Sequence, residues 1–139
     1  MEPVLAGLSM LLNLSTLTAI AFGVLIGVLV GALPGLSSPM AIALLIPFTI
    51  GMEPAAAIAM LAALYCAGTF GGSITAILIN APGAPPAAAT ALDGYPMAKR
   101  GEAGRALGIA TFSSVVGGLI GLLILLLAAP TLALSLIHI

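Results

Sequence analysis

Long stretches without a charged side chain constrain this chain more than any other feature. No Asp, Glu, Lys or Arg occurs in residues 3–52, 54–92 or 106–139. A charged residue at the centre of a membrane helix costs about 2.5–3.5 kcal/mol on insertion scales, which explains such tracts in a lipid environment. Only 5% of the residues are charged, whereas soluble domains have about 25%. We therefore expect an integral membrane protein with an all-α fold.

Four apolar runs are candidates for crossing or entering the bilayer, at residues 15–33, 39–51, 55–80 and 106–130. The first and the last approach the ~20 residues that a helix needs to span about 30 Å of hydrocarbon. Residues 39–51 are short for a crossing, and Pro47 predicts a kink within them. In residues 55–80 we expect the helix to break at Gly71-Gly72. Each of these two middle segments is therefore either a full crossing or a re-entrant segment.

Small residues recur at four-residue spacing in two of these runs. The first set is Gly23, Gly27 and Gly31, and the second is Ser113, Gly117 and Gly121. Residues four apart share one face of a helix, and small residues there let a neighbouring backbone approach closely. We predict that both faces serve helix packing. For the first face, contact with a ligand is the alternative.

The stretch from residue 68 to residue 86 combines helix breakers with polar side chains. It contains four glycines and three prolines, together with Ser73, Thr75 and Asn80. Unwound backbone at membrane depth is tolerated only where protein or a water-filled cavity satisfies its polar groups. The stretch is therefore a candidate binding site. The alternative is that the two hydroxyls only bond back to the preceding turn or to a neighbouring helix.

An internal similarity adds a second segment to this candidate site. Pro34-Gly35 and Pro82-Gly83 lie 48 residues apart, and the frame PG-x5-A-x-A-L begins at both. Paired helix breaks build the midplane site of many transporters, although chance similarity is the alternative in an alanine-rich chain. Free amides and hydroxyls suit an anion, and unwound carbonyls suit Na⁺. The predicted substrate-binding residues are Pro34, Gly35, Ser37, Ser38, Gly71, Gly72, Ser73, Thr75, Asn80, Pro82 and Gly83.

Catalytic and metal-binding patterns are not recognisable in the sequence. His138 is the single histidine and has no triad partner, and Gly71-Gly72-Ser73 is not a G-x-S-x-G nucleophile elbow. Cys66 is alone, so it predicts neither an intrachain disulfide nor a thiolate cluster. We expect no enzyme activity, no bound metal and no cofactor. Nucleic acid is excluded as a partner, because there is no basic face to neutralise phosphates.

The basic residues indicate one side of the membrane. Lys99, Arg100 and Arg105 are the chain's three basic residues and fall within seven positions. The positive-inside rule places the loop 97–105 in the cytoplasm. Asp93 to Pro96 is expected to lead out of a short helical turn toward this loop. The N-terminal orientation stays open, because the two middle segments either cross or turn back.

Three blocks of sequence resemble one transporter family. They are GVLVGALPGL (residues 27–36), GGSITAILINAPG (residues 71–83) and ALDGYPMAKRGEAGRALG (residues 91–108). These blocks strongly resemble the large membrane subunit of the tripartite tricarboxylate transporters, the TctA family. The likeness runs from about Leu5 to Leu132, and the block over residues 71–108 is the most specific part.

The resemblance implies a repeat-built secondary transporter in the bacterial inner membrane. Its substrates would be citrate-like carboxylates, delivered by a periplasmic solute-binding protein and moved with Na⁺ or protons. A small membrane subunit would be the second partner. Members of the family are several times longer, so the resemblance implies that residues 1–133 are an N-terminal part of the membrane domain.

Two further expectations concern the end of the chain and its function. Residues 134–139, LSLIHI, match the translation of a common sequencing adaptor, which predicts a non-native tail. The predicted function is cation-coupled carboxylate transport by alternating access. The alternatives are a non-transporting membrane scaffold, in which the glycines only join helices, and an ion channel that conducts without a binding protein.

Overall fold

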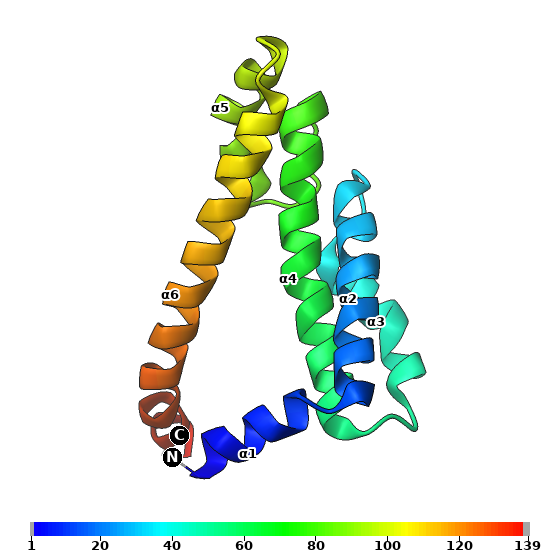
Figure 1. Cartoon of the computed structure of the whole chain (residues 1–139), viewed down its shortest axis with the longest axis vertical. Helices are drawn as coiled ribbons and strands as arrows, with labels where there is room; N and C mark the ends of the chain where they lie inside the picture. Colours follow the sequence, from blue (N-terminus) through cyan, green and yellow to red (C-terminus); the bar gives the residue numbers. More distant parts are fainter. Residues whose placement is uncertain (1, 138–139) are drawn as a thin grey trace. The chain divides into compact units, whose positions relative to one another are not determined.

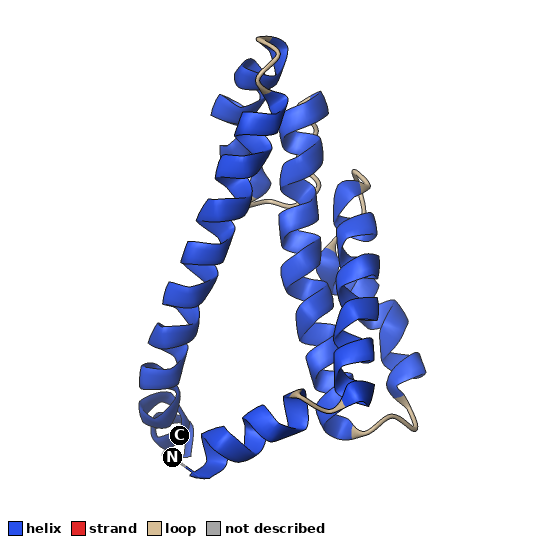
Figure 2. Cartoon of the chain, in the orientation of Figure 1, coloured by secondary structure: helices blue, strands red, loops and turns tan. Residues whose placement is uncertain are grey.

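The computed structural model describes residues 2–137 of the chain, and the elements within this range are helices (Figures 1 and 2). They are α1 (Glu2–Leu11), α2 (Leu14–Ala32), α3 (Ser38–Leu45), the 3-10 helix η1 (Ile46–Thr49), α4 (Pro54–Ile79), α5 (Ala87–Lys99) and α6 (Ala103–Ile137). Three of them are long and apolar enough to cross a membrane: α2, α4 and residues 103–129 of α6. The predicted all-α membrane fold is therefore confirmed. His138 lies outside the described residues.

The chain divides into two compact units, residues 1–107 and residues 108–139. The described part of the second unit is the continuation of α6, a single apolar helix. A lone helix has no neighbour within its own unit. The packing face predicted at Ser113, Gly117 and Gly121 therefore stays a prediction.

In the first unit, α2 and α4 pack side by side and run in the same direction (Figure 1). Three glycines of α2 lie so close to α4 that a Cβ atom would collide with a backbone carbonyl oxygen. Each contact joins residues 37 positions apart: Gly23 with Met60, Gly27 with Leu64, and Gly31 with Gly68. A constant offset over successive turns means that the helices are parallel and in register. The packing role predicted for the first glycine face is confirmed.

The segment after α2 is short and kinked, as its length and proline predict. The Ser37 hydroxyl accepts a hydrogen bond from the Met40 backbone N–H at 3.3 Å and so caps α3. Pro39 stands in the first turn, where its missing N–H costs nothing. Near Pro47 the α-helix gives way to the 3-10 helix η1, which ends at Thr49. The two helices together have only 12 residues.

The predicted break at Gly71-Gly72 is wrong, because α4 continues through both glycines to Ile79. A glycine in a helix costs about 1 kcal/mol relative to alanine, which is a weak preference that packing overrides. Both glycines are buried against neighbouring backbone, which leaves no room for a side chain. The helix ends instead at Asn80, which adopts a left-handed conformation (φ 56°) and donates its N–H to the Thr75 carbonyl.

After α4 the chain turns back along the helix before it rises again. The Gly83 N–H donates to the Gly72 carbonyl at 3.4 Å, so this loop lies about 10 Å back from the end of α4 at ~1.5 Å per residue. From there α5 runs beside α4 in the same direction (Figure 1). Its buried face packs Ala87 and Ala91 against Ala76. The chain therefore turns back at residues 80–86 and not at the two helix glycines.

The loop predicted at residues 97–105 is much shorter in the structure, because α5 extends to Lys99 and α6 starts at Ala103. The expected exit at Asp93–Pro96 is also wrong, since these residues lie within α5. Gly94 is buried there, and a Cβ on it would lie 2.7 Å from Cγ1 of Ile77. The turn itself is closed by Gly101 (φ 85°), the left-handed residue that commonly ends a helix.

Candidate functional site

A shallow cleft of about 340 Å³ lies between the two Pro-Gly loops of the first unit. One wall comes from the loop between α2 and α3, and the other from the loop between α4 and α5. The lining residues are Gly35, Leu36, Ser37, Pro82, Gly83, Ala84 and Pro85. The two segments related by the internal sequence similarity thus meet in space. The cleft is built of loop backbone and small side chains.

The walls of this cleft carry backbone donors that the fold does not use. Within residues 2–137, the hydrogen bonds leave the N–H groups of Gly35, Ser37 and Ala84 without an acceptor. Neighbouring N–H groups are satisfied, for example Leu36, which donates to the Leu33 carbonyl at 3.2 Å. Gly35 and Ser37 are exposed and Ala84 is half-buried, so these N–H groups are open to water or to a polar ligand. An anion or water would satisfy all three.

Two helix N-termini border the cleft. Ser37 is the N-cap of α3, and Pro85 immediately precedes Pro86, the N-cap of α5. Helix N-termini carry partial positive charge, which favours negative charge beside them, while the first N–H groups of α5, those of Ala87 and Ala88, already donate to the Ala84 and Pro85 carbonyls. The Ser37 hydroxyl already accepts from Met40 and keeps its own proton to donate. The local electrostatics therefore favour an anion without a cationic side chain.

Three glycines hold the second wall against the helices. A Cβ on Gly83 would collide with the Gly31 carbonyl oxygen and lie 3.1 Å from Cα of Gly72. A Cβ on Gly72 would lie 2.7 Å from the Ala84 nitrogen and 3.0 Å from the Ala84 Cβ. The wall is thus positioned by direct backbone contact with both α2 and α4.

The structure brings four of the eleven predicted site residues to the cleft, namely Gly35, Ser37, Pro82 and Gly83. Pro34 is exposed beside the first loop but does not line the cleft. Ser38 is buried, with its hydroxyl 2.5 Å from the position of a Cβ on Gly68. These two residues support the loop and the start of α3.

The remaining predicted site residues belong to α4 and its cap. Gly71 and Gly72 are buried packing positions of the helix. Thr75 donates its hydroxyl to the Gly72 carbonyl at 3.3 Å, the bond to the preceding turn that stood as the alternative. Ser73 is half-buried on α4, and Asn80 is the exposed C-cap. None of these five lines the cleft.

Sequence reasoning missed three lining residues, Leu36, Ala84 and Pro85. Leu36 and Ala84 directly adjoin the predicted residues Gly35 and Gly83, and Ala84 and Pro85 fall within the candidate stretch 68–86 without being singled out. Their side chains are apolar, and the donors of Ala84 and its neighbours belong to the backbone. The signal that would have found them is loop position and not side-chain type.

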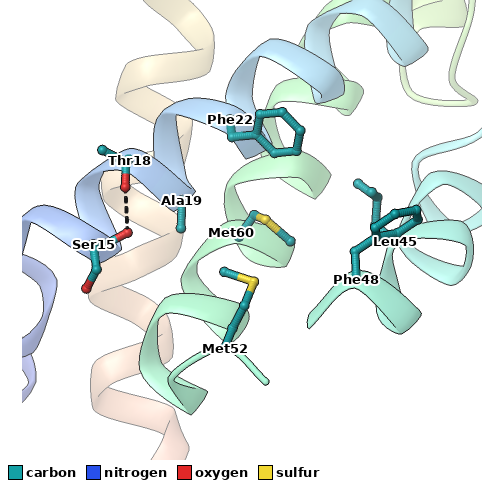
Figure 3. Close-up of a pocket in the computed structure, with 8 residues that line it drawn as sticks. All are labelled: Ser15, Thr18, Ala19, Phe22, Leu45, Phe48, Met52 and Met60. Atoms are coloured by element: carbon teal, nitrogen blue, oxygen red, sulfur yellow. Dashed lines mark hydrogen bonds between the residues drawn. The ribbon is translucent and has the colours of Figure 1, made fainter. Parts of the chain in front are cut away.

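A second cavity of about 440 Å³ lies between α2, the α3–η1 segment and α4 (Figure 3). It is lined by Ser15, Thr18, Ala19, Phe22, Leu45, Phe48, Met52 and Met60. The Thr18 hydroxyl donates to the Ser15 carbonyl at 2.9 Å, so this polar group is used within α2. Apart from the Ser15 hydroxyl, the other lining side chains are aromatic, aliphatic or thioether groups. The lining of this cavity is therefore mostly apolar.

The three basic residues and Glu102 lie around the turn between α5 and α6. The Lys99 ammonium lies 4.8 Å from the centre of the Tyr95 ring. Arg105 and Glu102 form an exposed ion pair at 3.5 Å. Neither these groups nor Arg100 lines the cleft. In the described part of the chain, His, Cys, Asp and Glu form no group of three that could hold a metal ion.

Comparison with known proteins gives two matches. A family model described as the tripartite tricarboxylate transporter TctA family matches residues 17–138. An uncharacterized 52.8 kDa protein in the TAR-I ttuC' 3'region of Agrobacterium vitis is 48% identical over 111 residues. These residues are 80% of this chain and 22% of that protein, so the chain spans less than a quarter of its relative's length. No solved structure matches the chain.

Proposed function

Because this chain belongs to the tripartite tricarboxylate transporter TctA family, we propose that it forms part of the permease subunit of a binding-protein-dependent secondary transporter. The substrate is a tricarboxylate or dicarboxylate anion, of which citrate is the first candidate. Transport is by alternating access and is coupled to Na⁺ or protons. The subunit works by binding and moving its substrate and is not an enzyme.

One observation is the main support for a carboxylate-binding site. Three unpaired N–H groups, those of Gly35, Ser37 and Ala84, belong to residues that line one cleft between two helix N-termini. A carboxylate has two oxygens that accept several hydrogen bonds, and backbone donors at a helix N-terminus stabilise it. A cleft of about 340 Å³ is at the lower end of the volumes typical of small-molecule sites. Backbone donors therefore replace the arginine expected of a soluble carboxylate site.

The sidedness of the cleft follows from the positive-inside rule. With the Lys99–Arg105 region in the cytoplasm of a bacterium, the C-terminal ends of α2 and α4 lie on the cytoplasmic side. The cleft lies at the end of α2 and about 10 Å short of the end of α4, because the Gly83 N–H donates to the Gly72 carbonyl. The N-terminal ends then face the periplasm, where the solute-binding protein delivers the anion. A small membrane subunit completes the complex in the inner membrane.

The scaffold alternative is favoured only by the α2–α4 contact. Glycines at that contact bring two backbones together, which is what helix association requires. A scaffold does not require unpaired donors in a cleft, so it leaves the two Pro-Gly loops unexplained. The channel alternative predicts conduction without a binding protein.

Uptake of labelled citrate, with and without Na⁺, tests the proposal. The full-length subunit is expressed with its solute-binding protein and small membrane subunit, and each component is omitted in turn. We expect uptake that requires all three components and saturates with substrate. Assembly of the complex without uptake of any di- or tricarboxylate would support the scaffold. Citrate current in liposomes containing the subunit alone would support the channel.

A further inference from the structure

Two adjacent glycines in the middle of α4 face different partners. A Cβ on Gly71 would lie 2.7 Å from the Val28 carbonyl oxygen and 3.1 Å from the Ala32 nitrogen, both in α2. A Cβ on Gly72 would lie 2.7 Å from the nitrogen and 3.0 Å from the Cβ of Ala84, in the second wall of the cleft. One glycine thus serves the helix pair and its neighbour serves the cleft.

We propose that Gly72 is a positioning residue that sets the separation between the two walls of the cleft, and thereby the affinity for the carboxylate. Its effect on affinity rests on the proposed function, whereas its effect on wall separation does not. Gly72 itself contacts no substrate in this account. It acts through Ala84, whose N–H is one of the three unpaired donors.

The contact at Gly72 cannot relax cheaply, because the atoms that a methyl group would meet include backbone. The Ala84 nitrogen and the Gly83 carbonyl carbon, at 2.7 and 3.2 Å, are fixed parts of the loop. On the other side of the loop, Gly83 lies against the Gly31 carbonyl. Since α4 is a 26-residue helix packed along α2, the shorter loop is the part that moves. The wall then shifts relative to Gly35 and Ser37.

The loop is also tied to Gly72 by a hydrogen bond. The Gly83 N–H donates to the Gly72 carbonyl at 3.4 Å. This bond is at the long end of the normal range, so a displacement of a few tenths of an ångström breaks it. A methyl group on Gly72 therefore loosens the wall as well as moving it. Gly71 has no such connection to the loop.

Two measurements on the full-length subunit test the proposal. The first uses a Cys66→Ala background with Ser37→Cys and Pro85→Cys on opposite walls, cross-linked by bis-methanethiosulfonates of increasing length. The second is the KM and maximal rate of citrate uptake with the native cleft residues. Each is made in the parent, in Gly72→Ala and in Gly71→Ala. The two alanine variants are matched, because both place one methyl group on neighbouring positions of the same helix.

In Gly72→Ala we expect the preferred cross-linker length to change. We expect KM to rise about tenfold, because one charge-assisted hydrogen bond to the carboxylate is lost, and the maximal rate to stay within about twofold of the parent. In Gly71→Ala we expect a lower yield of assembled protein but the parent's cross-linker preference and KM. An unchanged cross-linking profile in Gly72→Ala would overturn the proposal. Equal changes of KM in the two variants would overturn it as well.

A failure of the proposed function is distinguishable from a failure of this inference. Suppose that the parent takes up no carboxylate but Gly72→Ala still changes the cross-linker preference. The positioning role of Gly72 is then supported, and the proposed carboxylate substrate is rejected. If Gly72→Ala does not assemble, Gly72→Ala with Ala84→Gly removes the contact with the Ala84 Cβ at 3.0 Å and keeps the one with the backbone nitrogen at 2.7 Å, which displaces the wall. That double variant should assemble with an altered cross-linker preference. A parental preference there would overturn the positioning role.

Discussion

The α2–α4 interface and the cleft use the same residue types for opposite results. At the interface, Gly23 and Gly27 sit inside a continuous helix, where the missing side chain lets two backbones touch and leaves no space. In the loops, Gly35 and Gly83 stand beside prolines after a helix has ended, and the Gly35 N–H is unpaired while the Gly83 N–H donates to the Gly72 carbonyl. Glycine closes a gap in the first region and borders one in the second.

The comparison shows that a glycine's role depends on whether the helix continues around it. Within a helix every N–H has a carbonyl partner, so glycine can only improve packing. After the helix ends, the same residue leaves donors that a ligand can use. Gly71 and Gly72 both lie within α4 and both serve packing, Gly71 against α2 and Gly72 against Gly83 and Ala84 of the loop that forms the second wall.

Gly27→Val should have the largest effect and should act on the interface alone. A Cβ at this position would lie 2.5 Å from the Leu64 carbonyl oxygen and 2.8 Å from the Ala67 Cβ. Overpacking of this kind costs about 1–3 kcal/mol, and we expect a value near 3 because the contact is with backbone. The free energy of unfolding in detergent measures it. Gly104→Ala, with no atom within 4 Å, is the control and should be stabilised by about 0.5–1 kcal/mol. If Gly27→Val leaves the free energy of unfolding unchanged, the α2–α4 interface does not require glycine at this position, and the contrast between the interface and the cleft fails.

Ser37→Ala should have the next largest effect and should act on the cleft. The change removes a cap, worth about 1 kcal/mol, and a hydroxyl donor beside the unpaired N–H groups. We expect the KM for citrate uptake to rise about tenfold, corresponding to about 1.4 kcal/mol. Ser37→Thr keeps both the cap and the donor and should remain within about threefold of the parent. Equal losses in the two variants would mean that the hydroxyl does not contribute to binding.

Asn80→Gly should have the smallest effect. It tests whether Asn80 acts as the C-cap of α4 or as a residue that binds the substrate. Asn80 holds a left-handed conformation that glycine adopts without strain, so we expect a gain of about 0.5 kcal/mol in stability. The side chain does not line the cleft, and KM should change less than about twofold. A large rise in KM with unchanged stability would restore Asn80 to the binding site.

The sequence was sufficient for the fold class, the existence of long apolar helices and the first packing face. Charge-free tracts and glycines at four-residue spacing are local signals, and each describes a whole helix. The short α3–η1 segment was predictable for the same reason, because Pro47 acts on its own helix. These features need no knowledge of which segments meet.

The details of the candidate site depend on contacts between distant residues. Gly71 and Gly72 together predict a helix break. In the structure Gly71 lies against Val28 and Gly72 lies against Ala84, and both partners are far away in the chain. Tertiary packing decided the conformation against local preference. The meeting of the two Pro-Gly loops was suggested by their shared sequence frame. The apolar lining residues gave no signal, because their donors are backbone groups.

Protection of a cysteine at Ser37 by substrate tests the central claim most directly. The full-length subunit carries Ser37→Cys in a Cys66→Ala background, because the native thiol is exposed. The rate of maleimide modification is measured with and without citrate, and Gly104→Cys serves as the control position. Occupation of the cleft predicts modification at least about fivefold slower with saturating citrate at position 37 and unchanged at position 104. Equal rates at position 37 with and without citrate, in protein that transports it, would show that the anion binds elsewhere.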